Sequence, residues 1–421
     1  MGTKNYNNYS DMITFSRAST GTYLDSDGLL KSAAINTPRV EYDYQGNRLG
    51  LLVEEARTNL ITHQTHNFTG SISATDEANT EVAAPTGIID GLKITPTANL
   101  GTHTVYYPGS SDASVQSYTS SVYVKQGNAT HAQLIFGTNS ANDGIAVILD
   151  FSTGDYTIDN AGTGYTLLSA GAENVGNGWY RLHVAMDATA TASYTYVGVS
   201  NGSRSWTATG AEYIYAWGGQ REAGSFPTSY IPTSGATATR AADVASIGVG
   251  AFGYNKTAGS VLVEATYNAD PTLSSYIVEF SDGTVQNNHF LFCNGSPITA
   301  RVTNSGTLEA NLQVTGATPV SQGYNFKASY ALSEDNFNLA IDGSLAAGDT
   351  SVSVPTVNNL FVGSRLGSGY MFTGHISSIA YYPRRLTDAQ IKALTSPPET
   401  PTLSLTFDDS STSYLETSIH G

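Results

Sequence analysis

The sequence predicts an all-β protein: two antiparallel β-sandwich domains of the jelly-roll kind, preceded by a small N-terminal β leader. Of 421 residues, 42 are glycine, 26 are tyrosine and only 13% are charged, a composition that suits many short strands and turns better than helical bundles. Short apolar runs also recur between clusters of Gly, Asn, Asp and Ser, as strands do between turns. The length is sufficient for two or three domains that each bury a core.

Changes in composition divide the chain into four parts. We expect an N-terminal leader or attachment unit at 1–62, a jelly roll at 63–243, a second sandwich at 244–396, and a linker with a C-terminal tail at 397–421. The last part begins with a Pro-Pro pair, which stiffens the chain.

The leader contains two hairpin-like turns, at Asp25–Gly28 and Gln45–Asn47, and the sequence on both sides of each turn is typical of β-strands. Asp25-Ser26-Asp27-Gly28 lacks the later acidic positions and the bidentate glutamate of an EF-hand loop, so a tight turn is expected there.

Two adjacent carboxylates, Glu54 and Glu55, follow in the leader. Neighbours in a strand point in different directions, which argues against paired acid-base work on one substrate. Arg48 and Arg57 are close in sequence and offer ion pairs. A structural role is therefore expected for both glutamates.

The jelly roll is expected to contain eight strands that form a two-sheet sandwich. They are Gly91–Thr95, Thr102–Tyr107, Tyr118–Lys125, His131–Phe136, Ile145–Asp150, Tyr180–Met186, Tyr194–Val199 and Tyr213–Trp217.

One of these strands has a clear alternation, in the text GNGWYRLHVAM. Side chains alternate between the faces of a sheet, so Trp179, Arg181 and His183 project to one face and Leu182 and Val184 to the other. We expect Trp179 to pack as a structural residue.

The stretch 210–243 ends the jelly roll and leads into the next domain. Tyr213, Tyr215 and Trp217 alternate with small or aliphatic residues, which predicts a buried strand. Pro227 and Pro232 then exclude helix, so the following segment is expected to run extended along a surface.

The second sandwich opens with the text GSVLVEATYNAD. Further apolar segments then recur at the spacing of antiparallel strands with Gly turns. At its end, Thr387-Asp388-Ala389-Gln390 predicts the N-cap and first turn of a short helix. Cys293 lies in the apolar run FLFC and is expected to be a buried thiol.

Two stretches resemble bacteriophage structural proteins of the tail-fibre or head-fibre type, and a third resembles a known fold. The text from Trp217 through Gln220 and Glu222 to Phe226–Thr233 and Arg240–Asp243 resembles the end of a carbohydrate-binding-module-like jelly roll. The leader resembles the segment that precedes that jelly roll, in Phe15, Arg17, Tyr23, Pro38-Arg39, Gly50-Leu51-Leu52, Glu54, Arg57 and Asn59-Leu60. Residues 259–396, ending in HISSIAYYPRRLTDAQIKALTS, resemble the laminin-G or concanavalin-like fold.

Charge and hydropathy exclude several classes of function. The net charge is −16, and only 19 Lys and Arg residues are present, which argues against binding nucleic acid through its phosphates. No apolar run approaches the roughly 20 residues that span a bilayer, and the polar start lacks the apolar core of a signal peptide. We therefore expect synthesis in the host cytoplasm and no membrane insertion.

Sugar-binding modules commonly stack aromatic rings against the apolar face of a sugar, while polar groups fix its orientation. Tyr106, Tyr107 and Trp206 lie in polar, turn-rich text, and Arg204 is close to Trp206. These four residues are the predicted carbohydrate contacts, with Trp206 and Arg204 preferred.

No catalytic residues are predicted, and the chain is not expected to be an enzyme. A laminarinase-type site places two glutamates around an aspartate on one strand, and no such E-x-D-x-E pattern occurs. Glu279 has the wrong spacing for it. His289 and Tyr370 suggest the base and acid of a lyase, but no matching Arg and Gln strand motif accompanies them.

The resemblance implies a virion protein that binds bacterial surface polysaccharide and contacts other virion proteins through residues 1–62. A purely structural or decorative virion protein and, less favoured, a polysaccharide depolymerase remain alternatives. No cofactor is expected, although structural calcium is left open. A homotrimer, common among phage fibres, is also left open, although the chain shows neither the heptads nor the β-helix repeat that usually build a trimeric shaft.

Overall fold

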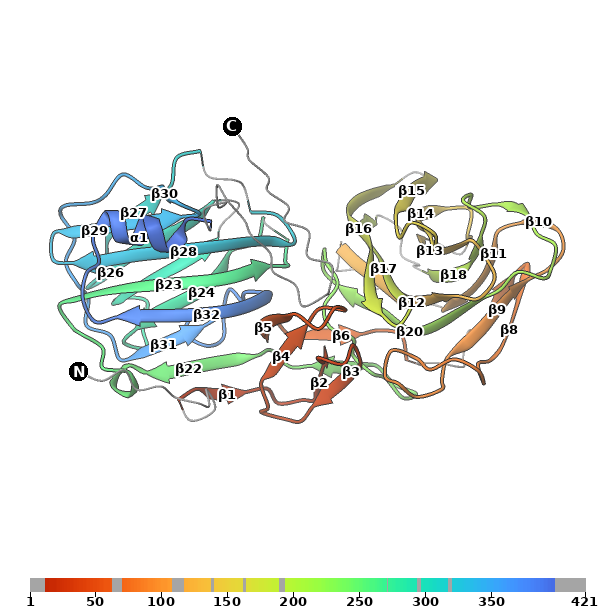
Figure 1. Ribbon diagram of the computed structural model, residues 1–421, viewed down its shortest axis with the longest axis horizontal. Helices are drawn as coiled ribbons and strands as arrows, with labels where there is room; N and C mark the ends of the chain where they lie inside the picture. The colour runs from red at the N-terminus through yellow and green to blue at the C-terminus, as the bar shows by residue number, and fades with distance from the viewer. Residues whose placement is uncertain are drawn as a thin grey trace, which may run out of the picture.

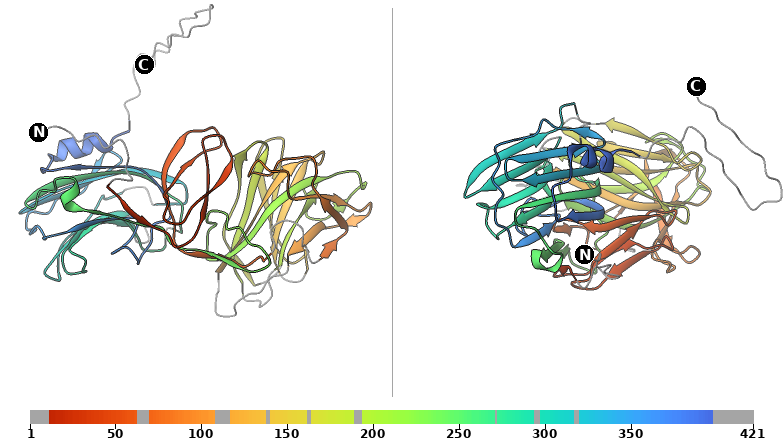
Figure 2. Two further views of the ribbon diagram at one scale, coloured as in Figure 1. Left: turned by 90° about the horizontal axis from the view of Figure 1, so that it is seen from below. Right: turned by 60° about the vertical axis from the view of Figure 1, so that its left-hand side comes forward.

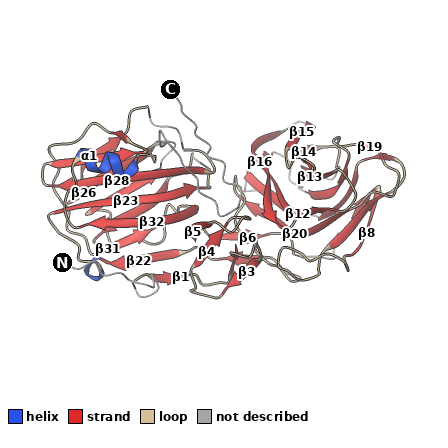
Figure 3. Cartoon of the chain, in the orientation of Figure 1, coloured by secondary structure: helices blue, strands red, loops and turns tan. Residues whose placement is uncertain are grey.

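The computed structural model describes residues 12–62, 70–107, 117–137, 140–161, 164–188, 194–270, 272–293, 297–316 and 320–397. Two β-sandwiches lie side by side, and the leader hairpins fill the space between them (Figures 1 and 2). Strands dominate, and α1 (Asp388–Thr395) is the one α-helix of the described residues (Figure 3). The prediction of an all-β fold is confirmed.

The first sandwich consists of two six-stranded antiparallel sheets. One sheet has the order β15 (Tyr156–Ala161), β14 (Gly144–Asp150), β13 (His131–Gly137), β18 (Tyr194–Ser200), β11 (His103–Tyr107) and β7 (Gly70–Ile72). The other has the order β16 (Tyr165–Gly176), β17 (Trp179–Ala188), β12 (Ser117–Gln126), β20 (Ile214–Ala223), β9 (Leu92–Pro96) and β8 (Ala74–Ala78). The short pair β10 (Leu100–Gly101) and β19 (Trp206–Thr207) lies beside them.

All eight strands predicted for the jelly roll are present, with ends shifted by a few residues. Within the two six-stranded sheets, β7, β8, β15 and β16 were not predicted, and they are the edge strands. The short strands β10 and β19 were not predicted either. The side chains of the edge strands are largely exposed or half-buried, and a strand that buries neither face shows little apolar alternation in its sequence.

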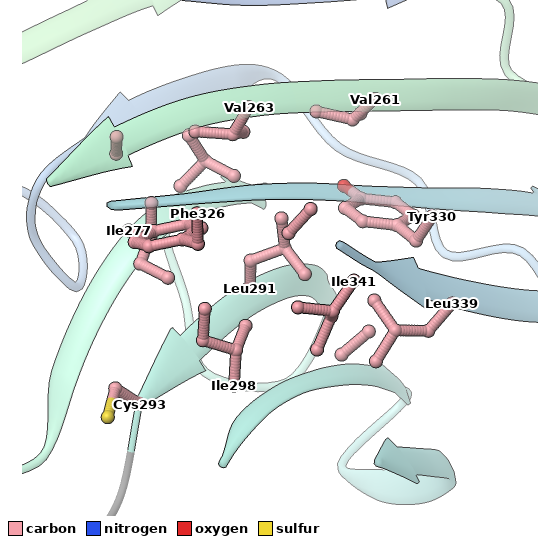
Figure 4. Close-up of a cluster of buried hydrophobic side chains, with 14 of the residues drawn as sticks. Val261, Val263, Ile277, Leu291, Cys293, Ile298, Phe326, Tyr330, Leu339 and Ile341 are labelled. Atoms are coloured by element: carbon pink, nitrogen blue, oxygen red, sulfur yellow. The ribbon is translucent and has the colours of Figure 1, made fainter. Parts of the chain in front are cut away.

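The second sandwich consists of two seven-stranded sheets around an apolar core (Figure 4). One has the order β30 (Ser344–Leu345), β29 (Asn336–Ile341), β28 (Tyr324–Ser333), β23 (Ala258–Tyr267), β32 (Gly374–Tyr382), β5 (Arg48–Val53) and β4 (Arg39–Tyr42). The other has the order β1 (Thr14–Ser16), β22 (Val244–Gly248), β31 (Asn359–Val362), β24 (Ser275–Ser281), β25 (Asn288–Cys293), β26 (Ile298–Asn304) and β27 (Thr307–Gln313). The short 3₁₀ helix η2 (Val249–Ala251) follows β22, and Cys293 is buried in the core as predicted.

The leader does not form a unit apart from the second sandwich. Strand β5 pairs with β32, with Leu52 opposite His375, and β1 pairs with β22, with Phe15 opposite Ala245. The leader thus extends both sheets of that sandwich. Strand β22 of the same sandwich begins at Val244, and the division of the chain into domains stays a prediction. The hairpin of β2 (Gly21–Leu24) and β3 (Leu30–Ala33) and the pair of β6 (Arg57–Asn59) and β21 (Ala238–Arg240) complete the junction.

The short C-terminal helix was predicted correctly. Thr387 accepts a hydrogen bond from the Gln390 backbone N–H, and the Gln390 side chain accepts one from Thr387 in return, which forms a capping box. The helix buries Ile391 against Ala331 and Ala340 of the neighbouring sheet. Of the predicted tail at 397–421, all but Pro397 lies outside the described residues.

Among the described residues, no helix has the length and apolar character needed to span a membrane.

Candidate functional site

The outer face of strand β17 forms one wall of a cleft. Leu182 and Val184 enter the core of the first sandwich, whereas Trp179 packs outside it against other aromatic rings. Arg181 and His183 share that outer face and line the cleft. The alternation predicted from the sequence is confirmed, including the structural role of Trp179.

The cleft has a volume of about 690 Å³ and lies where the first sandwich, the leader and the second sandwich meet. Polar side chains line all three walls. The first sandwich contributes Tyr123, Glu173, Arg181 and His183. The leader contributes Glu41, Asp43, Tyr44 and Glu54, and the second sandwich contributes Asn268, Asn325 and His375.

Arg181 occupies the centre of the first wall. In the sheet it lies directly between Glu173 of β16 and Tyr123 of β12. Its Nη2 donates to Ser121 Oγ at 3.0 Å, and its guanidinium carbon lies 5.5 Å from the centre of the Tyr123 ring. The residue is only 9% exposed, yet its Nε makes no hydrogen bond to any described residue. A buried donor without a partner is costly unless something else satisfies it.

His183 presents a second buried nitrogen in the same wall. Its Nε2 has no hydrogen-bond partner among the described residues. Burial, with a smaller effect of the Arg181 charge, lowers the pKa of His183 to about 4. Opposite it, Gly171 is required for close approach, because a Cβ there would lie 2.6 Å from the imidazole Cε1.

Two carboxylates that line the cleft, those of Glu173 and Glu41, are close enough for their charges to interact. Glu173 keeps solvent contact, but its pKa is raised, mainly because the surrounding walls desolvate it. The charge of Arg181 opposes this rise and that of Glu41 adds to it. Glu41 Oε2 contacts His375 Nε2 at 2.6 Å, and Asn268 lies 3.3 Å from the other ring nitrogen.

The floor of the cleft is a loop that is fixed from two sides. Glu222 of β20 accepts hydrogen bonds from the backbone N–H and the hydroxyl of Thr228. Glu54 of the leader accepts two from Ser229, each at 2.6 Å. The Pro-containing segment was predicted to run extended along a surface, but Phe226, Thr228 and Tyr230 are buried. The segment is held between the leader and the first sandwich by these hydrogen bonds.

Beneath this floor lies a buried cluster of arginines and carboxylates. Asp243 contacts Arg17 at 2.9 Å and Arg39 at 2.5 Å, and Glu54 contacts Arg39 at 2.8 Å and Arg240 at 3.4 Å. Burial alone would raise the pKa of Glu54, but the charges of Arg240 and Arg39 and the hydrogen bonds from Ser229 hold it well below its ordinary value. The cluster joins the leader to the segment that enters the second sandwich.

The structural role expected for both adjacent glutamates agrees with these contacts. Glu55 pairs with Arg57 at 2.5 Å, as the sequence suggested. Glu54 pairs instead with Arg39 and Arg240 and not with Arg48, because Glu54 is buried after the end of β5, whereas Arg48 at the start of that strand is exposed.

The preferred predicted sugar contacts lie elsewhere and are buried. Trp206 is 8% exposed, belongs to the core of the first sandwich, and packs edge to face on His103 at 5.2 Å. Arg204 donates to the carbonyls of Ala141 and Gly144 and pairs with Asp159 at 3.2 Å.

The two predicted tyrosines are adjacent on β11 and point to opposite faces. Tyr107 is buried, close to Gly219. Tyr106 is half-buried and packs against Tyr194 and Tyr196 of β18, on the outer face of the sheet that contains β11. None of the four predicted contact residues lines the cleft. Their placement gives each a packing role, and sugar contact at these positions stays a prediction.

The histidine and tyrosine weighed for lyase chemistry are not brought together by a described contact. His289 is buried, with its two ring nitrogens 2.6 Å from the Tyr330 hydroxyl and 3.0 Å from the Tyr254 hydroxyl. Tyr370 is 53% exposed and packs near Tyr276. The described residues contain no group of three or more His, Cys, Asp or Glu side chains arranged to hold a metal ion.

Because the folded protein disfavours a charge on the partly buried His183, we expect the protein to lose stability in mild acid. Below about pH 6.5 the unfolded chain protonates at His183, whereas the folded chain resists protonation until about pH 4. The contribution of His183 to stability is therefore complete above pH 6.5 and is lost as the pH falls towards 4. Between pH 7 and pH 5 this amounts to about 2 kcal/mol.

Urea unfolding of the wild type and of His183→Gln at the two pH values measures this contribution. The variant should lose less stability on acidification. The pKa of His289 is also lowered, to about 3, but its contribution is common to both proteins and cancels in the comparison. An equal loss in both proteins would contradict the placement of His183.

Comparison with known proteins finds similarity in structure only. No family model matches the sequence. No curated protein matches it either.

Three solved structures illustrate the similarity. The CBM40 of the Ruminococcus gnavus IT-sialidase, bound to α2,3 sialyllactose, is 16% identical, with 34% of this chain and 84% of that chain covered and a TM-score of 0.30. The NanB sialidase of Streptococcus pneumoniae is 13% identical over 40% of this chain and 29% of its own, with a TM-score of 0.31. The leech intramolecular trans-sialidase is 14% identical over 36% of this chain and 25% of its own, with a TM-score of 0.28.

These matches overturn the expectation that the chain is not an enzyme. Sialidases and a trans-sialidase are among the matching structures, although the match covers only 25–29% of those two enzymes. The lack of one glycosidase pattern and of one lyase motif does not exclude catalysis by other residues.

Proposed function

We propose that the cleft binds a glycan. The observation that carries this proposal is Arg181, which is nine-tenths buried in the wall of a 690 Å³ cleft with a donor that no described residue satisfies. The Nε–H is itself shielded from solvent, so the Arg181 side chain must shift for that group to donate to a hydroxyl oxygen of a bound sugar. The volume is within the range of pockets that hold small organic ligands.

The other polar groups of the cleft suit the same ligand. Sugars offer many hydroxyl groups, which donate to carboxylates and both donate to and accept from amides. Glu173 supplies a carboxylate, and Asn268 and Asn325 supply amides from the opposite wall. Tyr44 is 46% exposed beside the cleft and offers an aromatic face for stacking.

We propose further that this glycan is a bacterial surface polysaccharide and that the chain acts on a virion. The support is the resemblance of the leader and of residues 210–243 to phage structural proteins. A purely structural virion protein is the second candidate. It is favoured by the use of the resembling residues Arg17, Glu54 and Asp243 in buried ion pairs.

Binding to a panel of bacterial surface polysaccharides, with product size followed in the same samples, tests the proposal. Glu173→Gln should weaken binding about tenfold, since a hydrogen bond to a charged group contributes about 1.5–3 kcal/mol. Tyr44→Ala should weaken it several-fold through loss of a stacking contact. Tyr370→Ala is the matched control, because Tyr370 is an equally exposed tyrosine that does not line the cleft.

Equal binding by all three variants and the wild type would exclude the cleft as the binding site. Failure of the wild type to bind any polysaccharide would favour the structural candidate. Shortening of a bound polysaccharide would add catalysis to binding, and Glu173 would be the first residue to test for it.

A further inference from the structure

The charges in the cleft are unequally distributed. Glu41, Asp43 and Glu173 line it from two walls. The carboxylate of Glu41 is shared with His375, so any charge on that imidazole is already paired. Glu173 and Asp43 form no ion pair with another residue that the structure describes, and Glu173 is in contact with solvent. The charges available to a ligand in the cleft are therefore mainly negative.

The cationic side of the cleft is correspondingly weak. Among the described residues that line the cleft, Arg181 is the one arginine. Its side chain already donates a hydrogen bond to Ser121 and lies near the ring of Tyr123. The negative charges of Glu222 and Glu173 also interact with it. His183 is neutral near pH 7 because its pKa is lowered to about 4. The chain as a whole carries a net charge of −16, which further repels an approaching anion.

We propose that the cleft selects neutral glycans and discriminates against glycans that carry carboxylates, with Glu173 as a specificity-determining residue. This inference rests on the glycan binding proposed above. Glu173 accepts hydrogen bonds from sugar hydroxyls, which a neutral glycan supplies at every residue. A sugar carboxylate at the same place offers no proton at neutral pH and brings a second negative charge into a partly desolvated space, where charges interact more strongly than in water.

The discrimination should be strongest at low ionic strength. Salt screens charges that are accessible to solvent, and the Debye length falls from about 30 Å at 0.01 M to about 3 Å at 1 M. Because Glu173 keeps solvent contact, part of its repulsion should be removed by salt.

A pair of polysaccharides that differ only in carboxylates tests the inference. The polysaccharide that binds best in the panel is compared with a derivative of itself. If it is neutral, the derivative is oxidised at C6 to uronic acid. If it is acidic, the carboxylates of the derivative are reduced to hydroxyl groups. We expect the neutral member of the pair to bind at least about tenfold more tightly to the wild type at low salt, as one close repulsive charge pair implies. Glu173→Gln should reduce this ratio severalfold.

The control variant is Glu77→Gln, which removes a carboxylate from an exposed ion pair with Lys93 outside the cleft. It should leave the ratio unchanged. Equal or tighter binding of the acidic member would overturn the inference while leaving glycan binding intact. Lack of binding to every polysaccharide would instead overturn the proposed function, and the inference with it. A ratio that Glu77→Gln reduces as much as Glu173→Gln would also overturn the role given to Glu173.

Discussion

Replacing Asp243 with asparagine is expected to lower the free energy of unfolding by about 3–5 kcal/mol. Asp243 is fully buried and contacts Arg17 and Arg39, and it also accepts a hydrogen bond from the Glu54 backbone N–H. Asparagine has the same shape but no charge. Two buried guanidinium groups would therefore lose their counter-charge, and removal of one partner from a buried ion pair is strongly destabilising.

Urea unfolding with Glu77→Gln as the control measures this effect. Glu77 pairs with Lys93 at 3.3 Å, but its side chain is mostly exposed, so its loss should cost under about 1 kcal/mol. Equal effects of the two substitutions would show that the arginine–carboxylate cluster does not hold the junction together. Tight glycan binding by Asp243→Asn at a temperature where it remains folded would show that the cluster supports the cleft only through stability.

Replacing Trp206 with alanine is expected to lower the free energy of unfolding by about 3–5 kcal/mol, the usual cost of truncating a buried aromatic side chain. Trp206 lies in the core of the first sandwich, contacts His103 and donates from Nε1 to the Val199 carbonyl at 3.4 Å. The folded fraction of the variant should nevertheless bind glycan with unchanged affinity, because Trp206 does not line the cleft.

Leu100→Ala serves as the comparison. Leu100 lies in β10, opposite Thr207 of the strand that contains Trp206, but it is 71% exposed, so its truncation should change stability by less than about 1 kcal/mol. If Trp206→Ala were as stable as the wild type but did not bind glycan, Trp206 would be a sugar contact and not a core residue. The sugar contacts would then lie where the sequence predicted them.

Much of the fold followed from local sequence patterns. The strands with clear alternation, such as β17 and β20, bury one face in a core, and burial is what produces the alternation. The edge strands β15 and β16 lack that constraint and were missed. Pairing of β5 with β32 joins residues more than 300 positions apart, and no local pattern specifies such a partner.

Only one wall of the candidate site could be predicted from the sequence. The shared outer face of Arg181 and His183 was predicted from alternation, but nothing local indicated that the leader and the second sandwich would cover that face. Trp206 was preferred because its sequence neighbours are polar, whereas its ring, on the short strand β19, packs into the core of the first sandwich. A charged residue on the same strand face as a buried tryptophan was the signal that could have indicated the cleft.

Hydrogen–deuterium exchange of the protein with and without its best polysaccharide ligand tests the central claim most directly, because it reports all three walls of the cleft at once. Glycan binding in the cleft should protect β17 (Trp179–Ala188), β4 (Arg39–Tyr42) and the start of β32 (Gly374–Tyr382) together. Protection confined to β11 (His103–Tyr107) and β19 (Trp206–Thr207), with none at the cleft walls, would contradict the claim.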